Sequence, residues 1–158
     1  MPVMETFTSS KPKENVPSWA LRNESFNGDE LIEAYIKGCN EGVVRFKKVL
    51  IKKLEQNIWH TQELGSKFIA QLNKDNFICK SAHMKYLDIE KYKIIFVINH
   101  EIYYDYDKME PIYAMADAFE EHESNDDFDL EISFIPEVKS LNPHRLMSDG
   151  FIFHYDGE

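Results

Sequence analysis

The spacing of apolar residues changes about half-way along this chain. From about residue 32 to residue 72 they recur every three or four positions, which is typical of helices with one buried face. Beyond residue 77 they form a dense run at 92–98 and a strict alternation at 128–135, which is typical of strands. The pattern predicts an α+β fold: an N-terminal long helix or helical hairpin followed by a small mixed sheet.

Residues 92–98 are predicted to form the central strand of that sheet. Ile94 to Ile98 are consecutive large apolar residues, too few to span a membrane and too dense for a strand with one wet face. A crossover helix at about 108–122 separates this strand from the strand at 128–135. Because such crossovers are right-handed, the two strands should run parallel. Further strands are predicted at 77–82 and, at an edge of the sheet, at 151–155.

The N-terminal helix is predicted to cover residues 29–56, with Asp29 among its caps and acidic residues in its first turn. Its apolar residues alternate spacings of four and three, which is the a/d pattern of a coiled coil. These residues are Ile32, Ile36, Cys39, Val43, Phe46 and Leu50. The pattern predicts an interaction surface for a protein partner or for self-association, made by Ile32, Ile36, Val43, Phe46 and Leu50. A second helix is predicted at 57–72, where Gly65–Ser66 would form a break.

The predicted domain organisation is a flexible N-terminal tail at 1–27 and a single α+β domain at 28–158. Within that domain, residues 28–72 are the helical part and 77–156 the sheet part. Trp19 and Phe26 are large aromatic residues inside the polar tail. We expect at least one of them to pack on the body of the protein, because isolated aromatic side chains rarely stay in water.

The chain is acidic, with a formal net charge of -10 over 158 residues. This charge weighs against general nucleic-acid binding, which needs clustered Lys and Arg. One basic cluster is present, formed by Arg45, Lys47, Lys48, Lys52 and Lys53. It indicates either a solvated helical face or a docking face for an acidic partner.

The cysteines and the apolar runs predict a cytoplasmic protein with no membrane segment. Cys39 and Cys79 are far apart and match no metal-binding or redox spacing, so both thiols are expected to be free. No apolar run approaches the roughly 18 residues of a spanning helix, and no secretory leader opens the chain. Phosphate-binding loops, dinucleotide fingerprints and nucleophile-elbow motifs are absent from the sequence.

Three carboxylates suggest a metal site at the start of the central strand. Asp88 and Glu90 directly precede it, and Glu131 lies on the following strand. If those strands are neighbours, the three side chains meet at a sheet edge as oxygen ligands for Mg²⁺ or Mn²⁺. The arrangement resembles the acidic triad of the nucleotidyltransferase fold, in which an Asp-x-Asp pair opens one strand and a third acid lies on the next.

The resemblance to nucleotidyltransferases covers only Asp88 to about Phe134. The first acidic pair reads Asp88-x-Glu90, and Gly65–Ser66 lies more than 20 residues upstream of it, so the turn that cradles the triphosphate is missing from its expected position. The leading interpretation is a non-enzymatic binding or assembly module without a cofactor, which uses the heptad-patterned helix. The alternative is an active or inactive nucleotidyltransferase-like domain, with Asp88, Glu90 and Glu131 as catalytic metal ligands.

Overall fold

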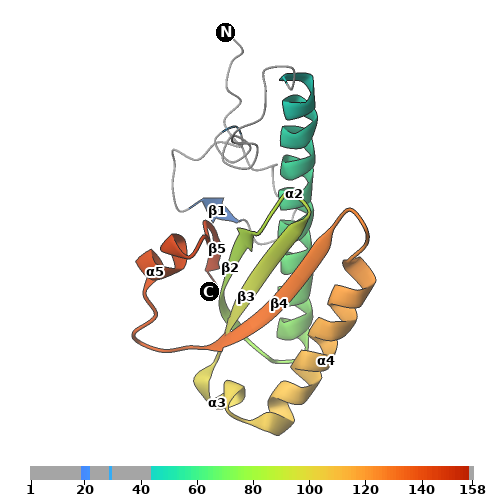
Figure 1. Ribbon diagram of the computed structural model, residues 1–158. Helices are drawn as coiled ribbons and strands as arrows, with labels where there is room; N and C mark the ends of the chain where they lie inside the picture. The colour runs from blue at the N-terminus through green and yellow to red at the C-terminus, as the bar shows by residue number, and fades with distance from the viewer. Residues whose placement is uncertain (1–18, 22–28, 30–43, 157–158) are drawn as a thin grey trace.

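The computed structural model describes residues 19–21, 29 and 44–156 of the chain (Figure 1). Its elements, in chain order, are β1 (Ala20–Leu21), α2 (Val44–Lys74), β2 (Cys79–Tyr86), β3 (Lys91–Ile98), α3 (His100–Tyr103), α4 (Tyr106–Glu123), β4 (Asp129–Pro136), α5 (Pro143–Ser148) and β5 (Phe153–Asp156). The strands form one sheet in the order β1-β5-β2-β3-β4. The predicted α+β fold, a long helix followed by a small mixed sheet, is confirmed.

The predicted central strand is β3, which lies between β2 and β4. It pairs antiparallel with β2 and parallel with β4, and β5 pairs antiparallel with β2. The helix α4 connects β3 to β4, so the predicted parallel unit with its crossover helix is confirmed. Asp105 caps this helix by accepting a hydrogen bond from the backbone N–H of Lys108.

Two strand predictions were wrong in position. The strand predicted at 77–82 begins at Cys79 and continues to Tyr86, so half of it lies beyond the predicted end. The strand near the C-terminus, β5, is not an edge, because β1 pairs with its outer side at Ala20 and Leu21. A strand of two residues has no recognisable alternation, and its pairing depends on tertiary contacts that bring it to β5.

Residues 44–74 form one uninterrupted helix, α2, of 31 residues. A separate second helix starting at residue 57 is therefore wrong, and Gly65–Ser66 lies inside α2 without breaking it. Burial of one helical face stabilises such a helix more than local propensity does, so a single glycine is tolerated. Of the predicted interaction residues, Ile32, Ile36 and Val43 lie outside the described residues.

The main hydrophobic core lies between one face of the sheet and the helices α2 and α4. Alternate side chains of β3, from Tyr92 to Ile98, are buried in it, whereas Lys93 and Ile95 between them are only partly buried. The expectation that both faces of this strand are covered is therefore wrong over most of its length, because the helices pack on one face of the sheet.

Phe68 of α2 is completely buried, with its ring centroid 4.8 Å from that of Phe96 on β3 and 6.0 Å from that of Phe134 on β4. The ring of Phe119 on α4 meets Phe68 edge-on at 5.5 Å, so one side chain joins all three layers.

Trp19 lies against α2, which confirms that an aromatic residue of the predicted tail packs on the body. Its ring nitrogen Nε1 donates a hydrogen bond to Ser66 Oγ at 3.1 Å, and its ring lies 6.2 Å from that of Tyr155. A Cβ atom on Gly65 would lie only 2.8 Å from Trp19 Cζ2. The pair expected to break the helix therefore forms the binding seat of Trp19. Apart from 19–21, residues 1–27 lie outside the described part of the chain.

The sheet edge at β4 is covered by the C-terminal end of α4. The backbone N–H of Leu130 donates to Ser124 Oγ at 3.0 Å, and that of Ile132 donates to Glu120 Oε1 at 2.5 Å. Burial raises the pKa of the Glu120 carboxyl, and the hydrogen bond from Ile132 opposes that rise. Side chains that satisfy edge N–H groups disfavour pairing with a strand of another molecule.

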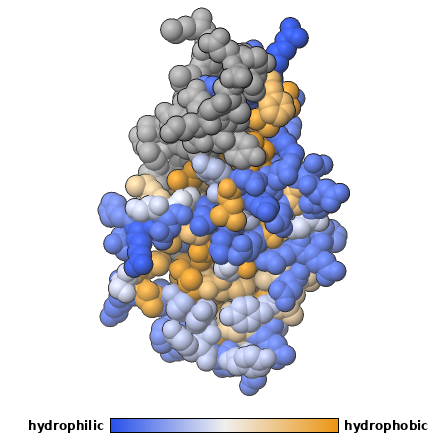
Figure 2. Space-filling view, viewed as in Figure 1, coloured by the Kyte–Doolittle hydropathy of each residue, from blue (hydrophilic) through white to orange (hydrophobic). Residues whose placement is uncertain are grey.

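The N-terminal end of α2 projects past the end of the sheet (Figure 1). From Arg45 to Lys53, all described residues, no side chain is buried, and Leu54 is the first buried residue after them. The space-filling view shows apolar atoms at the surface of this upper end, next to strongly hydrophilic ones (Figure 2). Among the described helices, none has the length and apolar composition required to cross a membrane.

The described cysteine, Cys79, is buried with a free thiol. Burial raises the pKa of this thiol to about 12, although hydrogen bonds with backbone groups oppose the rise. Since the thiolate is the reactive form, Cys79 is protected from oxidation and alkylation at neutral pH.

Candidate functional site

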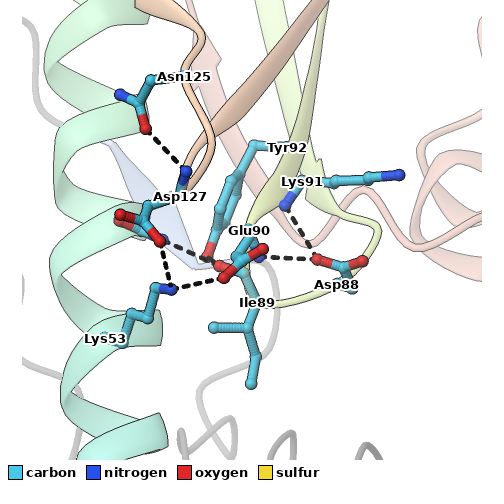
Figure 3. Close-up of polar contacts among 9 residues, drawn as sticks. Lys53, Asp88, Ile89, Glu90, Lys91, Tyr92, Asn125 and Asp127 are labelled. Atoms are coloured by element: carbon cyan, nitrogen blue, oxygen red, sulfur yellow. Dashed lines mark hydrogen bonds and ion pairs between the residues drawn. The ribbon is translucent and has the colours of Figure 1, made fainter.

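Asp88, the first of the predicted metal ligands, stabilises the turn between β2 and β3. Its Oδ1 atom accepts hydrogen bonds from the backbone N–H groups of Glu90 at 2.7 Å and Lys91 at 3.1 Å (Figure 3). Such side-chain capping of nearby backbone groups is the usual role of Asp in tight turns. The carboxylate of Asp88 is thus held in the turn by the chain that immediately follows it.

Glu90 belongs to an ionic cluster that joins α2 to two loops. Lys53 on α2 lies between two carboxylates, with Nζ 2.5 Å from Glu90 Oε1 and 3.6 Å from Asp127 Oδ1 (Figure 3). The hydrogen bond with Glu90 raises the pKa of the Lys53 ammonium, and partial burial opposes this. We call Lys53, Glu90 and Asp127 the lysine clamp, because it links α2 to the β2–β3 turn and to the α4–β4 loop.

Buried hydrogen bonds hold the same turn on α2. The carbonyl oxygen of Ile89 accepts bonds from Tyr92 Oη at 2.6 Å and from Asn57 Nδ2 at 3.0 Å. Burial raises the pKa of the Tyr92 hydroxyl, which therefore stays protonated and donates this bond. The backbone N–H of Asp129 also donates to the carbonyl of Glu90 at 2.6 Å, so β4 begins directly beside the turn.

The third predicted acid, Glu131, has a separate partner. It lies opposite Lys93 in the parallel register of β3 and β4, and Glu131 Oε1 is 2.6 Å from Lys93 Nζ. The structure therefore brings Asp88 and Glu90 into one turn but places Glu131 in another ion pair. In the part of the chain that the structure describes, no three His, Cys, Asp or Glu side chains are grouped closely enough to hold a metal ion. A Mg²⁺ or Mn²⁺ site at these acids stays a prediction.

Replacing Lys53 by Met is expected to lower the free energy of unfolding by only about 0.5 kcal/mol, because partly exposed ion pairs contribute little. The loss should shrink at high salt, which screens such pairs. Urea unfolding at low and high salt measures both effects, with Lys52→Met on the exposed neighbouring lysine as matched control. A loss above about 2 kcal/mol, as expected for a buried charge left unpaired, would contradict this interpretation.

The second candidate site is the exposed N-terminal end of α2. We call Arg45, Phe46, Lys48, Val49 and Lys52 the α2 head. The side chains of Phe46 and Val49 are 58% and 63% exposed, and the three basic residues beside them are exposed as well. Residues three apart on a helix are neighbours, so Phe46 and Val49 form one apolar surface between cations.

The structure divides the predicted interaction residues into those used internally and those left exposed. Leu50 is partly buried and packs against the main core, so it belongs to the protein's own interior. Phe46 lies on the same helical stripe one turn earlier and is exposed. Sequence reasoning missed Val49, which lies outside the a/d register; its position three residues after Phe46, inside the basic cluster, was the signal that could have identified it.

Comparisons with known proteins give no family for this chain. No protein family, no curated protein and no solved structure matches it.

Proposed function

We propose that this chain is a non-enzymatic assembly module that associates with protein through the α2 head. The observation that carries the proposal is the exposure of Phe46 and Val49 on a helix that projects past the sheet (Figure 1). A buried aromatic or aliphatic side chain contributes roughly 1.5–3 kcal/mol relative to an exposed one, so covering these residues favours association. Aromatic residues beside Arg are also the usual composition of interface centres.

The charge of the α2 head indicates the chemistry of the surface that it contacts. Arg45, Lys48 and Lys52 surround the apolar pair, whereas the whole chain carries a net charge of -10. Complementary charges at the rim of an interface accelerate association and exclude unsuitable partners. An acidic surface with exposed apolar groups therefore fits the α2 head, and a second copy of this acidic chain is one source of such a surface.

The carboxylates that suggested an enzyme have structural contacts that support the module instead. Asp88 caps a turn, and Glu90 and Glu131 each pair with a lysine of their own chain. A metal-binding role would require both acids to leave those lysines.

Light scattering across a dilution series tests the module as a self-associating protein. The wild type is expected to gain mass with concentration, and Phe46→Asp to weaken association at least about tenfold, because a charge replaces the apolar centre of the interface. Val138→Asp, on another exposed apolar residue, is the matched control and should behave like the wild type. A wild type that stays monomeric at every concentration, or a Phe46→Asp variant that associates normally, would refute self-association through the α2 head.

A further inference from the structure

A group of exposed tyrosines lies at the end of the molecule opposite the α2 head. Tyr104 and Tyr106 are 66% and 73% exposed, and Tyr113 follows one heptad after Tyr106 on α4. Positions seven apart share one helical face, so Tyr106 and Tyr113 point to the same side of α4. We call Tyr104, Tyr106, Glu110, Tyr113 and Asp117 the tyrosine patch.

Ring contacts hold several of these tyrosines in place. The ring of Tyr104 lies 4.7 Å from that of His100 and 5.1 Å from that of Tyr103, and the ring of Tyr113 meets Phe134 edge-on at 5.5 Å. Rigid aromatic side chains lose little conformational entropy on binding, which is why Tyr is enriched at interfaces. The ring contacts thus pre-order Tyr104 and Tyr113, so less side-chain entropy is lost when a partner covers the patch.

The tyrosine patch is also acidic. Glu110 and Asp117 are exposed on the same helical face as the two tyrosines of α4. Over the whole of α4, Asp and Glu outnumber Lys and Arg by six to one, whereas over α2 Lys and Arg outnumber Asp and Glu by seven to two. Each surface therefore has the apolar component and the opposite charge that the other one requires.

The two surfaces lie at opposite ends of the fold. In Figure 1 the N-terminal end of α2 is at the top, and α3 with the start of α4 is at the bottom. Pale, weakly hydrophilic side chains gather over that lower end in the space-filling view (Figure 2). One molecule cannot bring both ends together, but two molecules stacked end to end can.

We propose that copies of this chain associate head to tail, with the α2 head of one copy packed on the tyrosine patch of the next. This inference rests on the proposed function and identifies the surface that the α2 head contacts. Because the two surfaces differ, the interface is heterologous and leaves a free head and a free patch on every pair. Association then continues into chains, or into rings where the rotation between copies closes.

Symmetric arrangements conflict with the charges and with the sheet edge. Two α2 heads face to face would place Arg45, Lys48 and Lys52 of one copy opposite the same cations of the other. Two tyrosine patches face to face would likewise bring the carboxylates of both copies together. Like charges across an interface disfavour it. Pairing through β4 is disfavoured by Ser124 and Glu120, which occupy N–H groups of that edge.

A complementation experiment with two full-length variants tests the head-to-tail arrangement. Phe46→Asp disables the head and keeps the patch, whereas Tyr106→Ala/Glu110→Lys disables the patch and keeps the head. Asp126→Lys, an exposed acid in the loop after α4, is the control for charge reversal. Sedimentation velocity should find each disabled variant monomeric and the control assembled like the wild type. A 1:1 mixture of the two variants should form a dimer of one copy each and nothing larger, since only one working interface remains.

The other outcomes separate this inference from the proposed function. If Phe46→Asp is monomeric but the patch variant assembles like the wild type, the α2 head is the interaction surface and its contact with the tyrosine patch is refuted. If both variants are monomeric and their mixture stays monomeric, the heterologous arrangement is refuted while the α2 head survives. If the wild type is itself monomeric, or neither variant changes its assembly, self-association through the α2 head and its contact with the tyrosine patch are both refuted.

Discussion

Phe68→Ala is expected to lower the free energy of unfolding by about 3–5 kcal/mol, the range for removing a large buried aromatic side chain. Phe68 has no exposed surface, and its ring contacts Phe96, Phe119 and Phe134 on three different elements. The cavity left by the ring would lie where α2, α4 and the sheet meet. Because these elements are held together at that point, the structure has little freedom to collapse into the cavity.

Chemical denaturation followed by circular dichroism measures the effect of Phe68→Ala. Phe46→Ala is the matched control, since it removes the same ring from an exposed position of the same helix, and it should change stability by less than about 0.5 kcal/mol. Phe68→Leu should recover much of the loss because it refills most of the volume. Equal losses for Phe68→Ala and Phe46→Ala would contradict the packing described here.

Gly65→Ala is expected to destabilise the protein by about 1–3 kcal/mol, the usual range for overpacking. Alanine is about 1 kcal/mol better than glycine inside a helix, so local propensity alone predicts the opposite sign. The added Cβ would lie 2.8 Å from Trp19 Cζ2 and 3.2 Å from Ile94 Cδ1. The indole must therefore leave its seat and lose its hydrogen bond to Ser66, which also leaves that hydroxyl unpaired on a buried residue.

A double-mutant cycle with Trp19→Ala isolates this clash. Without the indole, Gly65→Ala meets only the flexible end of Ile94 and should be neutral or stabilising by up to about 1 kcal/mol. Denaturation of the two single variants, the double variant and the wild type measures the coupling. In a Trp59→Phe background Trp19 is the only tryptophan of the chain. Gly65→Ala should then shift the fluorescence emission of Trp19 to longer wavelength. Additive effects of the two substitutions would show that Trp19 does not occupy this seat.

Local patterns were sufficient to predict the class of the fold and its central unit. The apolar run of β3 and the alternation of β4 each depend on neighbouring residues, and the handedness of crossovers made those strands parallel. The cap of α4 is equally local, because Asp105 accepts its hydrogen bond from Lys108, three residues further on. Wrong boundaries arose where one segment suits both helix and strand, as at the start of β2.

The candidate sites were only partly predictable for a related reason. Asp88 and Glu90 were correctly placed at the start of the central strand, but their partners were not foreseen. Lys53 is 37 residues from Glu90, and Glu131 is 38 residues from Lys93, so no local pattern pairs them. The heptad pattern identified Phe46, yet periodicity alone does not distinguish a stripe that packs internally, as Leu50 does, from one left at the surface.

By itself, the sequence determined the α+β class, the strands β3 and β4 with their crossover helix, and the amphipathic character of α2. These follow from the geometry of single elements, in which side chains return to one face every two or every 3.6 residues. Only the tertiary structure decided which carboxylate meets which lysine, why Gly65–Ser66 stays within a continuous helix, and which ends of the fold carry the α2 head and the tyrosine patch. Such features depend on contacts between distant segments, such as that of Trp19 with Ser66, 47 positions further along the chain. The order of residues along the chain does not say which distant side chains meet, because those contacts form only when the core packs.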